Sequence, residues 1–214
     1  MLRKVTVETG VVEGIPAADP RITAFKGIPY AAPPVGEDRW RAPQPAKKWE
    51  GVLKAYKFAP ISMQHVPGED PDNIYSREWN VDTSIEMSED SLMLNVWTPA
   101  RRADEKLPVF VWYFGGGLRE GNTAEMEFDG ERLARRGIIV VTVNYRLNVL
   151  VSSPTRRSLR RTLNSPATSA IWISVSVPCG SSGTLQLSAA TRTISPSAVS
   201  RQAAEALWPR FPLP

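Results

Sequence analysis

Cysteine, histidine and long apolar runs are scarce in this sequence, and each shortage excludes a class of function. Cys179 is the only cysteine among 214 residues, so neither an internal disulfide nor a thiolate metal cluster can form. His65 is the only histidine, which severely restricts acid–base chemistry. No run of about 18 apolar residues occurs, which excludes a transmembrane helix. Residues 1–7 lack the apolar stretch of a secretion signal, so we expect a cytoplasmic protein with no metal and no cofactor.

Charge is distributed unevenly along the chain. Residues 1–150 hold 21 of the 22 acidic residues and all seven lysines. Residues 151–214 hold one acid, Glu205, with seven arginines and 13 serines, and they supply the whole net charge of +4. A basic segment often binds nucleic acid or anionic membranes. These arginines are scattered and only two adjacent pairs occur, so we expect neither partner.

Apolar patterning in residues 1–150 predicts an α/β fold. Residues 5–14 alternate around Gly10 as a hairpin would, and residues 22–30 and 92–98 are further strand candidates. Residues 107–114 and 138–145 are apolar on both faces, as central strands covered by two layers are. Between them, residues 129–137 indicate a short helix that ends at a glycine. Strand, helix and strand in this order define the α/β class.

Three consecutive glycines, Gly115, Gly116 and Gly117, directly follow a predicted buried strand. Without side chains their N–H groups can turn toward one point, which suits an anion or a developing oxyanion. A bare triple glycine is more often a flexible turn. It is not a phosphate-binding loop, because no Gly-Lys-Ser/Thr follows and the G-x-G-x-x-G spacing is absent.

Four strings in register give this loop a context. FKGIPYAAPPVGEDRWRAP (25–43), SEDSLMLNVWTP (88–99), LPVFVWYFGGGLREGN (107–122) and FDGERLARRGIIVVTVNYRLNV (128–149) resemble the N-terminal third of type-B carboxylesterases, the cholinesterase-like branch of the α/β-hydrolases. The resemblance implies an incomplete α/β-hydrolase fold over residues 1–150. It also implies hydrolysis of small-molecule carboxylic esters through a serine acyl-enzyme.

The resemblance assigns roles residue by residue. Gly116 and Gly117 would donate the two oxyanion-hole N–H groups, with Gly115 setting the turn. Arg39 and Glu89 match a structural ion pair of the family. The sequence departs from the family at Phe114 and Leu118, which flank the glycines, and at the positions of an early disulfide, where Ser62, Met63 and Ser91 stand. Loss of both cysteines together favours a reducing compartment.

The nucleophile and its base are missing from the sequence. No G-x-S-x-G elbow occurs, and the one histidine, His65, lies far upstream of the family's catalytic position and is expected at the surface. A serine without a base is a poor nucleophile, so we expect an inactive chain.

A shifted reading frame explains both gaps. Trp172 has one possible codon, and the phase that begins one base earlier must then encode Asp directly afterwards. With permitted codons, residues 167–174 can give the family segment Gly-Asn-Phe-Gly-Tyr-Leu-Asp-Gln. Residues 199–206 can give Gln-Ser-Ala-Gly-Gly-Gly-Ser, with the catalytic serine codon straddling Ser200 and Arg201. Residues 151–214 are therefore interpreted as an out-of-frame, poorly ordered tail.

Two other functions stay open from the sequence. The chain could be a noncatalytic binding protein, as the cholinesterase-like adhesion proteins are, or its basic tail could be an interaction module. Within that tail, residues 171–177 have the pattern of a strand and could pair with an exposed sheet edge. The acyl and alcohol preference and the oligomeric state are not set by these motifs.

Overall fold

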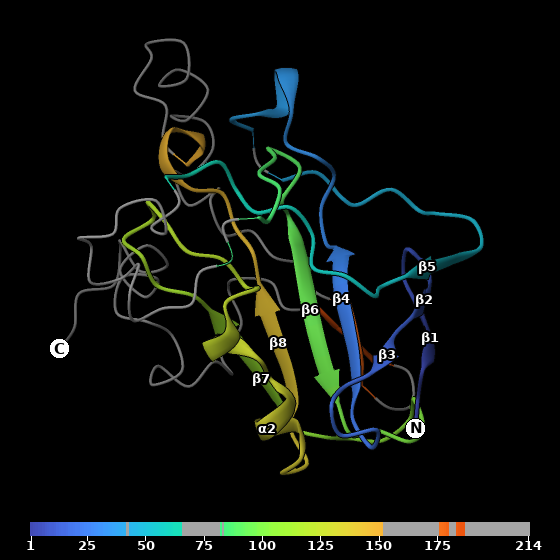
Figure 1. Cartoon of the computed structure of the whole chain (residues 1–214). Helices are drawn as coiled ribbons and strands as arrows, with labels where there is room; N and C mark the ends of the chain where they lie inside the picture. The colour runs from blue at the N-terminus through green and yellow to red at the C-terminus, as the bar shows by residue number, and fades with distance from the viewer. Residues whose placement is uncertain (42, 66–81, 83, 152–175, 180–182, 187–214) are drawn as a thin grey trace, which may run out of the picture.

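The computed structural model describes residues 1–41, 43–65, 82, 84–151, 176–179 and 183–186. Its centre is a five-stranded mixed sheet in the order β3-β4-β6-β8-β7. The strands are β3 (Ile15–Pro16), β4 (Thr23–Pro29), β6 (Met93–Thr98), β8 (Ile139–Val143) and β7 (Val109–Tyr113). Figure 1 shows the four longer strands side by side, with the helix α2 near one end of β7 and β8.

Register in this sheet follows the apolar sequence. β8 is buried at all five positions, as its uninterrupted β-branched composition predicts. It pairs antiparallel with β6 and parallel with β7, where Val111 faces Val141. β4 pairs antiparallel with β6 and carries a bulge between Phe25 and Ile28. The parallel pair β7 and β8, joined through α2, is the unit that the sequence predicted.

A second, smaller sheet lies beside β4 in Figure 1. It consists of β1 (Lys4–Val7), β2 (Gly10–Glu13) and β5 (Val52–Lys54) in the order β1-β2-β5. β1 and β2 form the hairpin expected around Gly10, and β5 adds to β2 in parallel. Val12 and Phe25 form a common core cluster with Ala55, which joins the small sheet to the large one.

The helix α2 (Glu131–Ala134) is short and packs on the sheet through Ala134, which is fully buried. Gly130, just before it, lies so close to Val140 and Trp97 that a Cβ would be 2.7 Å and 2.9 Å from them. Glycine is therefore required for the helix to begin against the sheet. Single 3-10 turns cover the ranges Gly36–Asp38, Met126–Phe128 and Asn148–Leu150.

The α/β class is confirmed, and one predicted strand borders the sheet within the described residues. Residues 107–114 were expected to form a central strand, but β7 pairs with β8 alone within the described residues and so borders the sheet. Three of its five positions are only partly buried. A strand with apolar residues on both faces is expected to be covered by a layer on each side. This pattern does not indicate where in the sheet the strand lies.

Only short pieces of residues 151–214 belong to the described structure. β9 (Ser176–Cys179) and β10 (Gly183–Gln186) form an antiparallel pair with Ser176 opposite Gln186. Residues 171–175 of the predicted strand, and residues 199–206 of the predicted elbow, lie outside the described residues. Among the helices of the described ranges, none has the length and apolar character needed to cross a membrane.

Candidate functional site

The glycine loop, residues 115–121, begins where β7 ends. Gly116 has a φ of +120° and Gly117 a φ of +63°, and Leu118 continues with a φ of +59°. A Cβ on Gly116 would lie 1.9 Å from the carbonyl oxygen of Glu120. No side chain fits at that distance, so the turn itself requires glycine at position 116.

Hydrogen bonds fix the direction in which this loop presents its N–H groups. The carbonyl of Gly116 accepts from the N–H groups of Arg119 at 3.0 Å and Glu120 at 3.3 Å. Because the C=O and N–H of a trans peptide point in opposite directions, the N–H of Gly117 points away from this turn. The N–H groups of Gly115, Gly116 and Gly117 have no acceptor among the described residues. The loop therefore offers consecutive unpaired donors, the arrangement that an anion requires.

Aromatic side chains support the base of the loop. Phe114 is buried and stacks on Tyr145, with ring centroids 4.2 Å apart and an interplanar angle of 12°. The hydroxyl of Tyr145 donates to the carbonyl of Phe114. Burial raises the pKa of Tyr145 well above its ordinary value, so this hydroxyl keeps its proton. Leu118, which directly follows Gly117, packs on the same core cluster.

A buried amide network continues behind the loop. The side-chain amide of Asn95 donates to the hydroxyls of Thr123 at 2.9 Å and Thr142 at 3.0 Å, and its oxygen accepts from the N–H of Gly27. The N–H of Thr123 donates in turn to the side-chain oxygen of Asn144. The network thus ties the strands β4, β6 and β8 to Thr123, which follows the glycine loop.

Glu125 places an unusual carboxyl near the loop. Burial is the main cause that raises its pKa to about 7, and the carboxylates of Glu127 and Glu120 raise it further, against a hydrogen bond from the N–H of Asn122 that lowers it. Its Oε1 accepts that N–H at 2.9 Å. No local sequence pattern marks this half-buried carboxyl, so Glu125 was not among the predicted site residues.

The structure places Arg39 and Glu89 in contact. Arg39 Nε lies 2.8 Å from Glu89 Oε2, and both side chains are about one-third exposed at 35% and 27%. Nearby, the buried Arg146 donates through Nη1 to the carbonyls of Arg39 and Arg41, at 3.0 Å each. These contacts tie residues 39–41 to Glu89 and to Arg146, which follows β8.

Within the described residues, His65, Ser62 and Ser91 form no hydrogen bond with the glycines at positions 115–117. His65 is exposed, as expected. Ser62 and Ser91 are buried, and the hydroxyl of Ser62 is engaged by the N–H of Leu147 at 3.1 Å. Within the described ranges, no three or more His, Cys, Asp or Glu side chains gather as metal ligands would.

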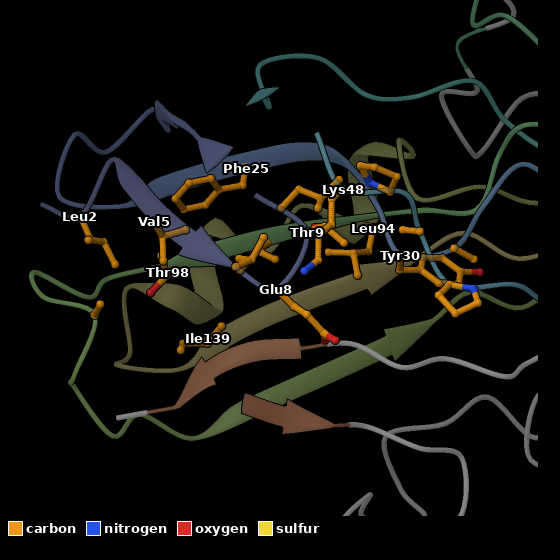
Figure 2. A pocket seen from close by; sticks show the side chains of 18 of the residues that line it. Leu2, Val5, Glu8, Thr9, Phe25, Tyr30, Lys48, Leu94, Thr98 and Ile139 are labelled. Atoms are coloured by element: carbon orange, nitrogen blue, oxygen red, sulfur yellow. The ribbon is translucent and has the colours of Figure 1, made fainter. Parts of the chain in front are cut away.

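A separate apolar cavity of about 480 Å³ lies between the small sheet and the large one. Figure 2 shows Leu2 and Val5 from the N-terminal segment and Phe25, Leu94 and Ile139 from the large sheet around it. None of the residues that line it belongs to the glycine loop. Its walls combine apolar side chains with charged ones, among them Lys48, Arg102 and Glu105.

Comparisons with known proteins agree with this fold. The model of the carboxylesterase family matches residues 2–152, and the chain belongs to that family, within the α/β-hydrolases.

Individual relatives match the same part of the chain. A fumonisin B1 esterase of Sphingopyxis macrogoltabida is 39% identical over 143 residues, covering 67% of this chain and 24% of that protein. The cholinesterase of Mus musculus is 40% identical over 149 residues, covering 68% and 24%. The crystal structure of a Geobacillus stearothermophilus carboxylesterase superposes with a TM-score of 0.56 at 35% identity, covering 69% of this chain and 27% of that one. The chain thus spans about a quarter of the length of the relatives it matches.

Proposed function

We propose that the glycine loop is the oxyanion hole of a carboxylic-ester hydrolase, with Gly116 and Gly117 as donors and Gly115 setting the turn. The observation that carries this proposal is the row of N–H groups at positions 115–117 without an acceptor among the described residues. Two donors aimed at a developing oxyanion stabilise the tetrahedral intermediate of ester cleavage more than the ground-state carbonyl. Membership of the carboxylesterase family supports the same reaction class, with small-molecule esters as substrates.

The proposal includes inactivity of the chain as it is written. Oxyanion stabilisation alone does not supply an attacking group, and neither a G-x-S-x-G elbow nor a second histidine occurs in the sequence. We attribute this to a change of reading frame near Leu150, and the end of the family match at residue 152 supports that interpretation. In this proposal, residues 1–150 are the N-terminal part of the hydrolase domain. Residues 151–214 are the out-of-frame tail, and the protein acts in the cytoplasm.

One experiment tests both parts. The purified chain is assayed with p-nitrophenyl butyrate, and so is the product of a gene in which one base is inserted near codon 150. We expect no turnover above buffer from the first and turnover from the second, with loss of activity when the restored elbow serine is changed to alanine. Enzymatic turnover by the unaltered chain that survives Ser200→Ala and disappears with a disrupted Gly116 would overturn the account of the missing nucleophile.

A noncatalytic binding role is the second candidate. The absence of a triad from the sequence favours it, because binding needs the unpaired donors and no base. The assay of the frame-restored gene distinguishes the two functions. If the chain is a binding protein with an intact reading frame, inserting a base near codon 150 produces no esterase activity. A specific, salt-sensitive ligand for residues 151–214 would instead favour the basic-tail interaction module.

A further inference from the structure

We infer that Gln64 is the positioning residue of the glycine loop, holding the loop at its last residue, Gly121. This inference rests on the proposed role of the loop as an oxyanion hole. Gln64 comes from the segment 62–64, which is distant in sequence from the loop and contributes no atom to the donors themselves. Its side chain nevertheless makes the contacts that determine where the loop ends.

The primary amide of Gln64 binds both backbone groups of Gly121. Its Oε1 accepts from the N–H of Gly121 at 2.7 Å, and its Nε2 donates to the carbonyl of Gly121 at 3.0 Å. The same Nε2 also donates to the carbonyl of Ser62 at 3.1 Å, which holds the side chain to its own segment. Since a side-chain amide has the donor–acceptor pair of a peptide, it fixes Gly121 in position and in orientation together.

Gly121 passes this constraint to the start of the loop. Its φ is +111°, and a Cβ there would lie 2.6 Å from the ring of Phe114 and 2.8 Å from the carbonyl oxygen of Gly115. The backbone of Gly121 is therefore in direct contact with the residues that precede the donating glycines. Because these residues are closely packed, a displacement of Gly121 would displace Phe114 and Gly115, and with them Gly116 and Gly117.

A second side chain closes the same ring of contacts. Asn148, which has a φ of +55°, donates from Nδ2 to the carbonyls of Arg119 at 2.7 Å and Met63 at 3.2 Å, and its N–H donates to the carbonyl of Leu118 at 2.8 Å. Three segments, 62–64, 118–121 and 147–148, are thus held together by amides. The carbonyls of Leu118, Arg119 and Gly121 accept these hydrogen bonds, while the N–H groups of positions 115–117 have no acceptor among the described residues.

The chosen variants separate positioning from folding. Gln64→Ala removes all three hydrogen bonds of the side chain, and Gln64→Glu keeps the acceptor for Gly121 N–H but loses both donors. Met63→Ala is the matched control, because that side chain is exposed and only its carbonyl takes part. All variants are made in the full chain and examined by ¹H–¹⁵N NMR and amide hydrogen exchange.

We expect the Gly121 amide of Gln64→Ala to exchange about fivefold faster or more. The resonances of Gly116 and Gly117 move, while those of β8 do not. Gln64→Glu keeps slow exchange at Gly121 and shows an intermediate displacement of the two glycine resonances. If Gln64→Ala does not fold, the displacement of the Gly116 and Gly117 resonances in Gln64→Glu tests the inference instead. Glycine resonances in the folded variants that coincide with those of Met63→Ala would overturn the inference.

Titration of the wild-type chain with sodium acetate keeps this test separate from the proposed function. Shifts of the Gly116 and Gly117 amides on addition of acetate support the anion site. If acetate leaves both amides unchanged, the proposed oxyanion role fails. The position of the loop in the Gln64 variants is still read directly from the spectra, so either statement can fail alone.

Discussion

Tyr145 and Phe114 make two contacts at once: their rings stack 4.2 Å apart, and the Tyr145 hydroxyl donates to the Phe114 carbonyl at 2.5 Å. One residue follows β8 and the other follows β7, so this pair joins the carboxyl ends of the two parallel strands. The glycine loop begins at the next residue. The pair is therefore the base from which the loop is built.

Removing the hydroxyl alone tests this base. Tyr145→Phe keeps the stacked ring and leaves the buried Phe114 carbonyl without its donor, so we expect a loss of about 1 kcal/mol in the free energy of unfolding. Tyr145→Leu also removes the ring and should cost about 3 kcal/mol. Urea denaturation of both variants measures the difference. Equal stability of Tyr145→Phe and the wild type would show that the hydrogen bond contributes nothing.

Two neighbouring glycines should respond differently to the same substitution. Gly116→Ala places a methyl group against the Glu120 carbonyl at 1.9 Å, so the loop must change its backbone path. Gly117→Ala meets nothing within 4 Å and carries only the cost of a φ of +63°, about 1 kcal/mol. Amide spectra should show loop-wide changes for Gly116→Ala and changes confined to neighbours for Gly117→Ala. Identical spectra for the two variants would contradict the described loop.

Acid should weaken the contact between the 17–22 loop and α2. The side-chain hydrogen bond from Arg21 holds the pKa of Asp19 well below its ordinary value. Burial alone would raise the pKa of Glu131, but hydrogen bonds from Arg135 and from the N–H groups of Asp19 and Ala18 lower it. Both carboxyls have depressed folded-state pKa values, so their stabilisation is present above about pH 4 and is lost as the pH falls further.

Asp19→Asn measures that contribution. The variant should lose stability at neutral pH and show a shallower decline than the wild type between about pH 5 and pH 2. Asp104→Asn is the control, because Asp104 forms an exposed pair with Arg102. Urea midpoints across this range provide the test, and parallel declines for the Asp19→Asn variant and the wild type would rule out the expected linkage.

The contribution of Glu125 to the free energy of unfolding should have the opposite dependence on pH. Its pKa is raised by burial to about 7, so the advantage of the neutral carboxyl is complete below about pH 4.5 and is lost as the pH rises through 7. Glu125→Gln keeps an acceptor for the Asn122 N–H and should stabilise the chain by roughly 1–2 kcal/mol above pH 7, allowing for solvent screening.

The stability of Glu125→Gln relative to the wild type, measured by urea denaturation at pH 5 and pH 8, tests this linkage. Glu50→Gln, at an exposed carboxylate that does not contribute to the shift at Glu125, should show little change. A gain for Glu125→Gln that is the same at both pH values would contradict the titration.

Local pattern predicted those elements whose partners lie close in sequence or whose burial is complete. The hairpin around Gly10 and the strand β8 follow from alternation and from β-branched apolar residues. β5 has only three residues, and its pairing with β2 joins Val52 to Val11, so no local signal marks it. The edge position of β7 depends on sheet order, which its composition does not encode.

The candidate site likewise has one feature that the sequence predicts and others that only the folded chain shows. The triple glycine is visible because glycine is required wherever the backbone turns this tightly. The hydrogen bonds of Gln64 span 57 residues to Gly121, and those of Asn148 join two further segments. Polar residues in loops are common, and only the folded chain distinguishes these two from the others. Gln64 has no sequence neighbour that distinguishes it from other polar loop residues.

Strand β7 is paired on one side only within the described residues, and its five residues Val109–Tyr113 contain neither a charge nor a proline. Such an edge is a template for a strand of a neighbouring molecule. The yield of soluble protein after refolding should therefore depend on protein concentration. At high concentration β7 can pair with a strand of another molecule, whereas at low concentration each chain folds before it meets a second one.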